Sequence, residues 1–402
     1  MRFFYLDPGL QNDVGHHANS CRVITSEMRR RGIEVIVASS VNITPVLKHE
    51  LGAWPLFSFY TYRTGNGEPI AGWISVFLQG VAITTGELAQ LPATTAEDVV
   101  YVNSALPAQL MSIISWLHNM PAKNRPRVVI EFGTRAGVES VMVGDKLQIT
   151  SADPRHEPRS VLYRYAGLTI PDALRKHLVL MTFDPMSSQE YEFIIGHKIG
   201  VLPLPQGTYR SLRHKVGKRP IVVGVLGHQR PDKGYEFVPE VISTVLSRHR
   251  NALFLVHNAT PNGMPATQRA IRRLAGSSHR ITLDERPADE RIWKALFAAT
   301  DIVLCPYTAA VYRHSYSAIA VEALANGVPM VAPAATSLSR FAEQHDGAVV
   351  TFPNDNAEAI ASATLEALDN FDKLADTAFS AATTWNRQDR KALLVDCILG
   401  RA

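Results

Sequence analysis

Residues 312–333 read YRHSYSAIAVEALANGVPMVAP, and this stretch decides how the rest of the chain is interpreted. A polar turn opens a helix, Gly327 ends it, and a short apolar strand runs from Val328 to Ala332. Such a unit points a helix N-terminus at the edge of a sheet, where anions bind readily. Glu322 lies in this helix among small and apolar residues. Because a bare carboxylate is costly to bury, two interpretations stay open: a glutamate that faces a ligand, or one on the wet face of an ordinary helix.

The composition is that of a globular protein. At 402 residues the chain is long for one core, so two domains are expected. A formal charge of +4 suits an anionic small ligand or contact with an acidic membrane, and is too weak for a nucleic-acid-binding surface. Three scattered cysteines and the lack of a signal-peptide or membrane-spanning pattern predict a cytoplasmic protein, with peripheral contact at the inner face of the membrane left open.

Strand and helix patterns alternate along both halves of the chain. The first half opens with an apolar strand at 3–6, a glycine-containing loop at 7–15, a helix at 16–31 and a strand at 34–38. After a proline-rich exit at 201–207, the alternation restarts with a strand at 221–226. This order predicts two parallel α/β sheets. Aromatic residues crowd the less regular stretch 45–86, as core residues or as a surface that binds an acceptor or a membrane.

Two loops carry candidate chemistry. Gly227 to Gly234 follows a strand and holds His228, Arg230 and Lys233, two of them cations that could stabilise a leaving diphosphate. Solvated surface cations are the alternative. In the first half Gly15 precedes His16 and His17 at a helix start; either histidine could reach a reacting sugar, or be purely structural.

Other chemistries are disfavoured by the spacing of the candidate residues. His16 and His17 lack further ligands at metal spacing, so no metal centre is expected. The chain has no Gly-x-Ser-x-Gly elbow, no phosphate-binding Walker loop and no dinucleotide-binding Gly-x-Gly-x-x-Gly after its first strand.

Taken in order, the second half resembles the retaining GT-B glycosyltransferases of family 4. The resemblance spans most of the chain, but its specific motifs are C-terminal. They are the glycine-flanked loop 227–234, ATDIVLCP at 299–306, VEALANGVPMVA at 321–332 and TFPND at 351–355.

The resemblance assigns roles to individual residues. Lys233 matches the lysine that contacts the donor diphosphate, and Glu322 the second glutamate of a Glu-x7-Glu pair, which holds the ribose hydroxyls. Ser317 and Ala318 match the helix N-terminus that donates backbone amides to the phosphates. Gly15 resembles the glycine that lets the donor approach the first domain closely.

Two positions depart from the family pattern. The first glutamate of the pair is replaced by His314, and the diphosphate arginine falls on His228, with Arg230 two residues nearer to Lys233. Because a neutral histidine both donates and accepts a hydrogen bond, we expect His314 to face the donor sugar or the β-phosphate and to alter sugar specificity.

The resemblance implies two facing Rossmann-like domains in the GT-B arrangement. The expected divisions are an acceptor domain at 1–205, a nucleotide-sugar domain at 206–384 and a helix at 385–402, opened by Trp385, that returns to the first domain. The implied reaction is metal-independent sugar transfer from a nucleotide-diphosphate donor to a glycan or lipid-linked acceptor, without a cofactor. A nucleotide-sugar epimerase of the same fold and a non-catalytic binding subunit are the alternatives.

Overall fold

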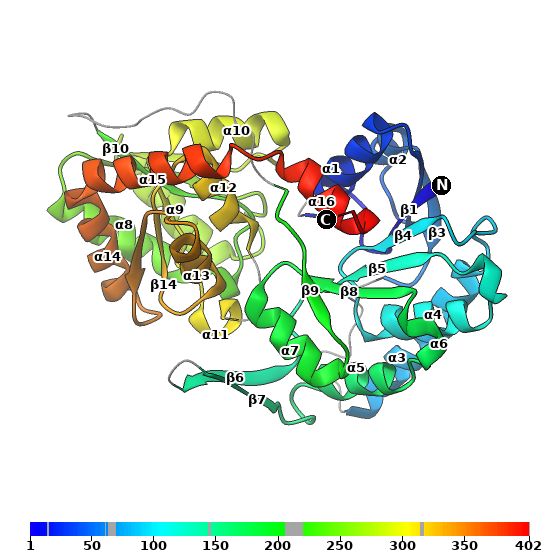
Figure 1. Cartoon of the computed structure of the whole chain (residues 1–402). Coiled ribbons are helices and arrows are strands. Elements are labelled where there is room, and N and C mark those ends of the chain that lie inside the picture. Colours follow the sequence, from blue (N-terminus) through cyan, green and yellow to red (C-terminus); the bar gives the residue numbers. More distant parts are fainter. Residues whose placement is uncertain are drawn as a thin grey trace. The chain divides into compact units, whose positions relative to one another are not determined.

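The computed structural model describes residues 1–13, 16–60, 62, 70–143, 146–205, 220–313 and 317–401. The chain divides into two compact units, Met1–Pro205 with Lys391–Ala402, and Gln206–Arg390. Each unit is built on one parallel sheet with buried apolar clusters on both of its faces (Figure 1). The prediction of two parallel α/β sheets is confirmed.

The first unit contains a seven-stranded sheet in the order β3-β2-β1-β4-β5-β8-β9. Its strands are nearly continuous apolar runs, as expected for parallel strands covered on both faces. They are β1 (Arg2–Asp7), β2 (Glu34–Ser40), β3 (Ala53–Phe57), β4 (Val99–Val102), β5 (Arg127–Glu131), β8 (Leu178–Thr182) and β9 (Ile199–Val201). A separate antiparallel hairpin pairs β6 (Val138–Val143) with β7 (Lys146–Ser151).

Helices cover this first sheet on both sides. They are α1 (His17–Arg30), α2 (Pro45–Leu51), α3 (Ile70–Leu88), α4 (Pro107–His118), α5 (Arg159–Leu168), α6 (Asp172–Arg175) and α7 (Pro185–Ile195). Within the aromatic stretch, Phe57, Phe59 and Phe77 are buried, which confirms the core interpretation for these three, while Tyr60 is exposed. Among the helices that the structure describes, none is long and apolar enough to cross a membrane.

The second unit contains a six-stranded sheet in the order β12-β11-β10-β13-β14-β15. Its strands are β10 (Ile221–Val225), β11 (Ala252–His257), β12 (Ile281–Asp284), β13 (Ile302–Leu304), β14 (Met330–Pro333) and β15 (Val349–Phe352). Its helices are α8 (Val238–Arg248), α9 (Pro265–Ser277), α10 (Glu290–Ala299), α11 (Ala309–Tyr312), α12 (Ala318–Asn326), α13 (Ser337–Gln344), α14 (Ala357–Asp369) and α15 (Phe371–Trp385).

Both sheets reverse their strand order at one place. The chain first builds outward from β1 to β3 and then returns to the other side of β1 with β4; the second unit does the same around β10, with β13 on the other side. In open α/β sheets, ligands bind beyond the carboxyl ends of the strands at such a reversal. The two places to search for a site are therefore the β1/β4 and β10/β13 edges.

The last helix, α16 (Arg390–Leu399), packs on the first unit beside α1 (Figure 1). Leu394, Val395 and Ile398 join its buried cluster, and Arg31 forms an ion pair with Asp396 at 2.5 Å. The expectation that Trp385 opens this helix is wrong, because Trp385 ends α15, where its buried ring packs against His345 of its own unit. The final helix begins at Arg390.

Candidate functional site

The loop after β10 turns back on itself because two glycines adopt conformations that other residues avoid. Gly227 has φ of 110° and Gly234 has φ of 60°. A side chain at position 234 would place its Cβ 1.8 Å from the carbonyl oxygen of Pro306. Only glycine fits there, and the single turn Pro231–Lys233 is thereby held against the segment that follows β13.

Lys233 is the central cation of this loop. Its Nζ lies 5.1 Å from the centre of the Tyr307 ring, within range of a cation–π interaction. Burial, reinforced by the charge of Arg230, lowers the pKa of Lys233 to about 8. An ammonium group disfavoured by burial gains when an anion arrives beside it, so the position suits a phosphate.

Arg230 and His228 lie in the same electrostatic environment. The Arg230 guanidinium donates to Asp232 Oδ2 at 2.8 Å and to the Tyr312 hydroxyl at 3.3 Å. Burial, and then the charges of Arg230 and Lys233, lower the pKa of His228. His228 is therefore neutral at pH 7, when the two neighbouring side chains carry the positive charge.

The N-terminus of α12 is linked to Lys233 through Tyr307. Ser317 precedes the helix in an extended conformation, and its side chain is hydrogen-bonded to Tyr307 instead of capping the helix. The Tyr307 and Tyr312 rings in turn lie 4.4 Å apart. Because Ser317 does not use its hydroxyl as a cap, first-turn amides such as that of Ala318 can donate to an anion.

A cavity of about 500 Å³ opens beside the loop. It is lined by residues 228–231, which follow β10, and by residues 259–263, which follow β11. Its volume is in the range of pockets that hold small organic ligands. The cations therefore lie at the strand-order reversal on the carboxyl edge of the second sheet, and the cavity lies beside them, between the loops that follow β10 and β11.

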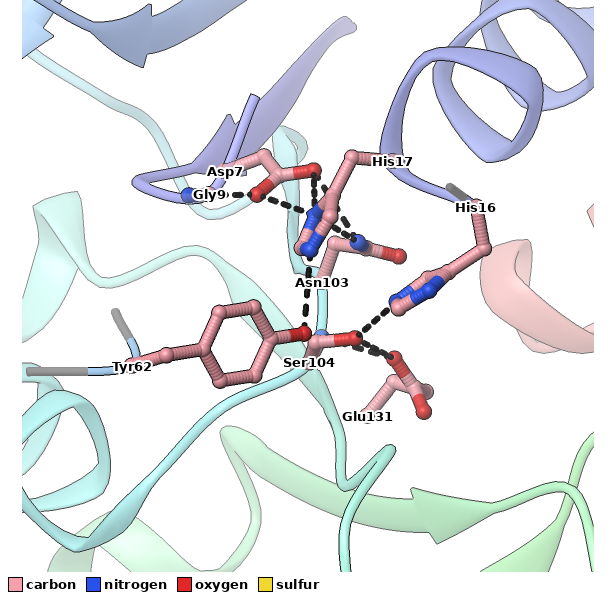
Figure 2. Close-up of polar contacts among 8 residues, drawn as sticks. All are labelled: Asp7, Gly9, His16, His17, Tyr62, Asn103, Ser104 and Glu131. Carbon is pink, nitrogen blue, oxygen red and sulfur yellow. Dashed lines mark hydrogen bonds and ion pairs between the residues drawn. The ribbon is translucent and has the colours of Figure 1, made fainter. Parts of the chain in front are cut away.

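A second polar cluster occupies the corresponding edge of the first sheet (Figure 2). His17 Nδ1 lies 2.9 Å from both carboxylate oxygens of Asp7, and Asn103 donates to Asp7 Oδ2 at 3.0 Å. His17 Nε2 lies 2.9 Å from the Tyr62 hydroxyl. Burial alone would lower the pKa of His17, but the charge and hydrogen bond of Asp7 outweigh it and raise that pKa. Asp7 and His17 thus form a buried ion pair.

Ser104 joins His16 to Glu131 in this cluster. The Ser104 hydroxyl lies 3.0 Å from His16 Nε2 and 3.5 Å from Glu131 Oε2, and the Ser104 amide donates to the same carboxylate oxygen at 2.7 Å. The residue His16 as a whole is exposed, but its ring stacks on the His17 ring, with ring centres 4.3 Å apart. Removal from solvent, and then the charge of His17, lower the pKa of His16, so it is the neutral member of the pair.

Residues 218–370 match the family model described as "Glycosyl transferases group 1". The match covers most of the second unit, including the β10 loop and α12. No curated protein sequence matches the chain.

Solved structures resemble the whole chain. HepE from Anabaena, in complex with UDP, is 16% identical, with a TM-score of 0.63 over 100% of this chain and 99% of that one. A UDP-forming α,α-trehalose-phosphate synthase from Burkholderia xenovorans is 11% identical, with a TM-score of 0.64 over 100% and 98%. A putative UDP-N-acetylglucosamine 2-epimerase from Listeria monocytogenes is 13% identical, with a TM-score of 0.60 over 99% and 95%. The two Rossmann-like domains match the GT-B fold.

The structure brings most of the predicted donor-site residues together. Lys233, Arg230 and Ser317 contact Tyr307 or Tyr312, and Gly227 and His228 belong to the same loop as the two cations. Ala318 opens α12, and Glu322, half-buried, lies one turn further along the same helix. His16 belongs to the other unit. Gly15 and His314 lie outside the described residues, so their roles stay predictions.

Sequence reasoning named both histidines but missed the rest of this cluster. The missed residues are Asp7, Tyr62, Asn103, Ser104 and Glu131. Asp7, Asn103 and Glu131 each stand where an apolar strand ends, which is a signal that the sequence does carry. The described part of the chain contains no group of three or more His, Cys, Asp or Glu residues suited to a metal ion.

Proposed function

We propose that this protein is a glycosyltransferase that moves a sugar from a nucleotide-diphosphate donor to a saccharide or lipid-linked acceptor. One observation carries the proposal: Lys233, Arg230 and the N-terminus of α12 are linked through Tyr307 and Tyr312 at the strand-order reversal of the second sheet. The group 1 match covers the same residues. The HepE complex with UDP makes a uridine nucleotide the first donor to test.

In the proposed reaction the bond between the anomeric carbon and the β-phosphate oxygen breaks. A new bond forms to an acceptor oxygen, whose proton passes to the departing diphosphate. Lys233 and Arg230, with the Ala318 amide, stabilise the charge that develops on the leaving oxygen, so no metal ion is required. Glu322 holds the ribose hydroxyls, and Gly227 allows the donor to approach the loop closely.

Retention of anomeric configuration and membership of family 4 belong to the proposal. They are supported by the motifs around Lys233 and Glu322, but His314 and His228 stand where that family has a glutamate and an arginine. In our proposal Arg230 replaces the missing arginine. The first unit supplies the acceptor side of the reaction, with His16 in contact with the reacting sugar.

The direct test is sugar transfer from UDP-glucose and a panel of other nucleotide sugars to mixed glycan and lipid-linked acceptors, with EDTA present. Release of nucleoside diphosphate that depends on acceptor, together with a labelled product, is expected. A Lys233→Met variant should lose about tenfold or more in rate, because one charge-assisted contact to the leaving group is worth about 1.5–3 kcal/mol. Lys373→Met, at an exposed position on α15, is the matched control and should leave the rate unchanged.

An epimerase is the second candidate, and one observation favours it. The putative UDP-N-acetylglucosamine 2-epimerase from Listeria monocytogenes has the same fold over 99% of this chain. Incubation with UDP-N-acetylglucosamine and no acceptor separates the two functions, since an epimerase changes the sugar under these conditions and a transferase does not. Donor binding with neither reaction across the panel would instead indicate a non-catalytic binding subunit.

A further inference from the structure

The buried polar residues of the first unit form one continuous hydrogen-bonded chain. Asp7 is bonded to His17, His17 to Tyr62, and Tyr62 to Ser104. At Ser104 the chain branches to His16 and to Glu131 (Figure 2). The buried ion pair is thereby connected to the neutral imidazole of His16 through two hydroxyl groups, those of Tyr62 and Ser104.

Ser104 is held in a conformation that places its hydroxyl at this branch. Its φ of 52° lies in the left-handed region, which is uncommon for a residue with a side chain. Gly133 leaves room for the hydroxyl, because a Cβ there would lie 2.7 Å from Ser104 Oγ and 3.1 Å from Glu131 Oε1. Local strain at such a position persists when the surrounding structure demands it, and it is often found at functional sites.

We propose that Glu131 is a positioning residue: acting through the Ser104 hydroxyl, it selects which ring nitrogen of His16 carries the proton. The reason is that a hydroxyl group has one proton to donate. The charged His17 donates to the Tyr62 hydroxyl, so Tyr62 gives its own proton to Ser104 Oγ. The Ser104 proton then goes either to Glu131 or to His16, and the other of these two contacts must run in the opposite direction.

The two arrangements place the His16 proton differently. When Glu131 is ionised it accepts the Ser104 proton, and Ser104 Oγ then accepts a bond from His16 Nε2–H, which leaves Nδ1 as a bare acceptor. When Glu131 is protonated it donates to Ser104 Oγ, and Ser104 donates to His16 Nε2, so the ring proton moves to Nδ1. His16 stays neutral in both arrangements and changes only its tautomer.

The surroundings of Glu131 place this change near neutral pH. Burial raises the pKa of Glu131 to about 7, opposed by the Ser104 amide and by His17, while Asp7 raises it further. The other titratable groups that act on or are influenced by Glu131 are four tyrosines, which stay protonated near neutral pH: Tyr5, Tyr62, Tyr101 and Tyr191. His16 itself is influenced by His17 and Asp7.

The consequence for catalysis rests on the proposed function. Above about pH 7 the His16 ring has an unprotonated Nδ1, which can accept a hydrogen bond from a sugar hydroxyl. Below that pH the same atom carries a proton and can only donate. The sugar hydroxyl would then change its orientation when Glu131 gains or loses a proton, although Glu131 itself touches no substrate.

The test is nitrogen NMR of the full chain labelled with 15N-histidine, since the two imidazole nitrogens have distinct shifts in each tautomer. A His16→Gln variant identifies the His16 signals. Between pH 5.5 and 8.5 we expect His16 to pass from the Nδ1–H to the Nε2–H tautomer with a midpoint near 7. In Glu131→Gln and in Ser104→Ala this pH-dependent change should disappear. A His16 tautomer that does not change across this range, or one that still changes in Ser104→Ala, would overturn the proposal.

Two further variants keep the test sound. Ser104→Gly suits the positive φ and removes the same hydroxyl, so it replaces Ser104→Ala if that variant does not fold. Ser112→Ala is the matched control, because Ser112 is a buried serine of α4 whose hydroxyl donates to Ala108 in its own helix. In this variant the His16 tautomer should change with pH as it does in the unaltered protein. The NMR readout needs no activity, so a tautomer change without sugar transfer would refute the proposed function and leave this inference standing.

Discussion

At the scale of single residues, Lys233 makes donor binding depend on pH. Its pKa of about 8 in the free protein lies below the ordinary value of 10.5. A bound diphosphate favours the ammonium form and raises that pKa, so binding takes up a proton between the two values. We expect UDP affinity to fall above pH 8, by up to about tenfold per pH unit, as measured by calorimetric titration. In Lys233→Met the decline should vanish; an equal decline in that variant would contradict the assignment.

The lowered pKa of Lys233 also makes the stability of the fold depend on pH. The unfolded chain keeps a proton on Lys233 up to its ordinary pKa, while the folded chain releases it from about pH 8. The unfolded state therefore binds more protons between pH 8 and 10.5, and the contribution of Lys233 to the free energy of unfolding rises with pH over this window. Binding and stability thus respond to alkaline pH in opposite directions at this one residue.

His314 is the second residue whose chemistry can be tested separately. It stands eight positions before Glu322, where the family pattern has a glutamate, and we expect it to contact the donor sugar or the β-phosphate. Replacement of His314 by alanine should lower the transfer rate by about two- to tenfold, because one neutral hydrogen bond to the sugar is worth about 0.5–1.5 kcal/mol. UDP affinity should stay within about twofold, because UDP lacks the donor sugar. Equal rates in the two proteins would remove His314 from the site. A parallel loss of UDP affinity would show that His314 contacts the phosphates and not the sugar.

At the scale of elements, the β10 loop depends on Gly234. An alanine there would pay for a left-handed backbone and would also collide with the Pro306 carbonyl. We expect Gly234→Ala to lower the free energy of unfolding of the second unit by more than about 3 kcal/mol, measured by denaturant titration.

Gly327→Ala is the matched control for this substitution. Gly327 ends α12 with φ of 65°, but the nearest atom to an added Cβ lies 3.4 Å away. It should cost only the conformational penalty of about 1–2 kcal/mol. Equal losses in the two variants would show that the Pro306 contact does not hold the loop.

At the scale of the whole molecule, the strand order explains which features the sequence could predict. Residues that act together within one stretch, such as Gly227, Lys233 and Gly234, are visible as a glycine-flanked loop after an apolar strand. Asp7, Asn103 and Glu131 are far apart in sequence, and only the pairing of β1 with β4, and of β4 with β5, brings them to one edge. The prediction for Trp385 failed for a related reason. Trp385 ends α15, and its ring packs against His345, a residue far away in the sequence.

Both units use the same reversal of strand order to build a polar site, and the sites differ in charge. The β10/β13 edge gathers cations beside a helix N-terminus, which suits a diphosphate. The β1/β4 edge contains a buried Asp7–His17 pair and a neutral His16, which suits sugar hydroxyls. This division supports our assignment of the donor to the second unit and of the acceptor to the first.

The most direct test of the central claim is a calorimetric titration of the full chain with UDP in the presence of EDTA, repeated with Lys233→Met and Lys373→Met. We predict one UDP bound per chain without a metal ion, an affinity at least about tenfold weaker in Lys233→Met, and an unchanged affinity in Lys373→Met. Binding of UDP that is equally tight in all three proteins, or no binding of UDP or of any other nucleoside diphosphate, would contradict a nucleotide-diphosphate site at the β10 loop and α12.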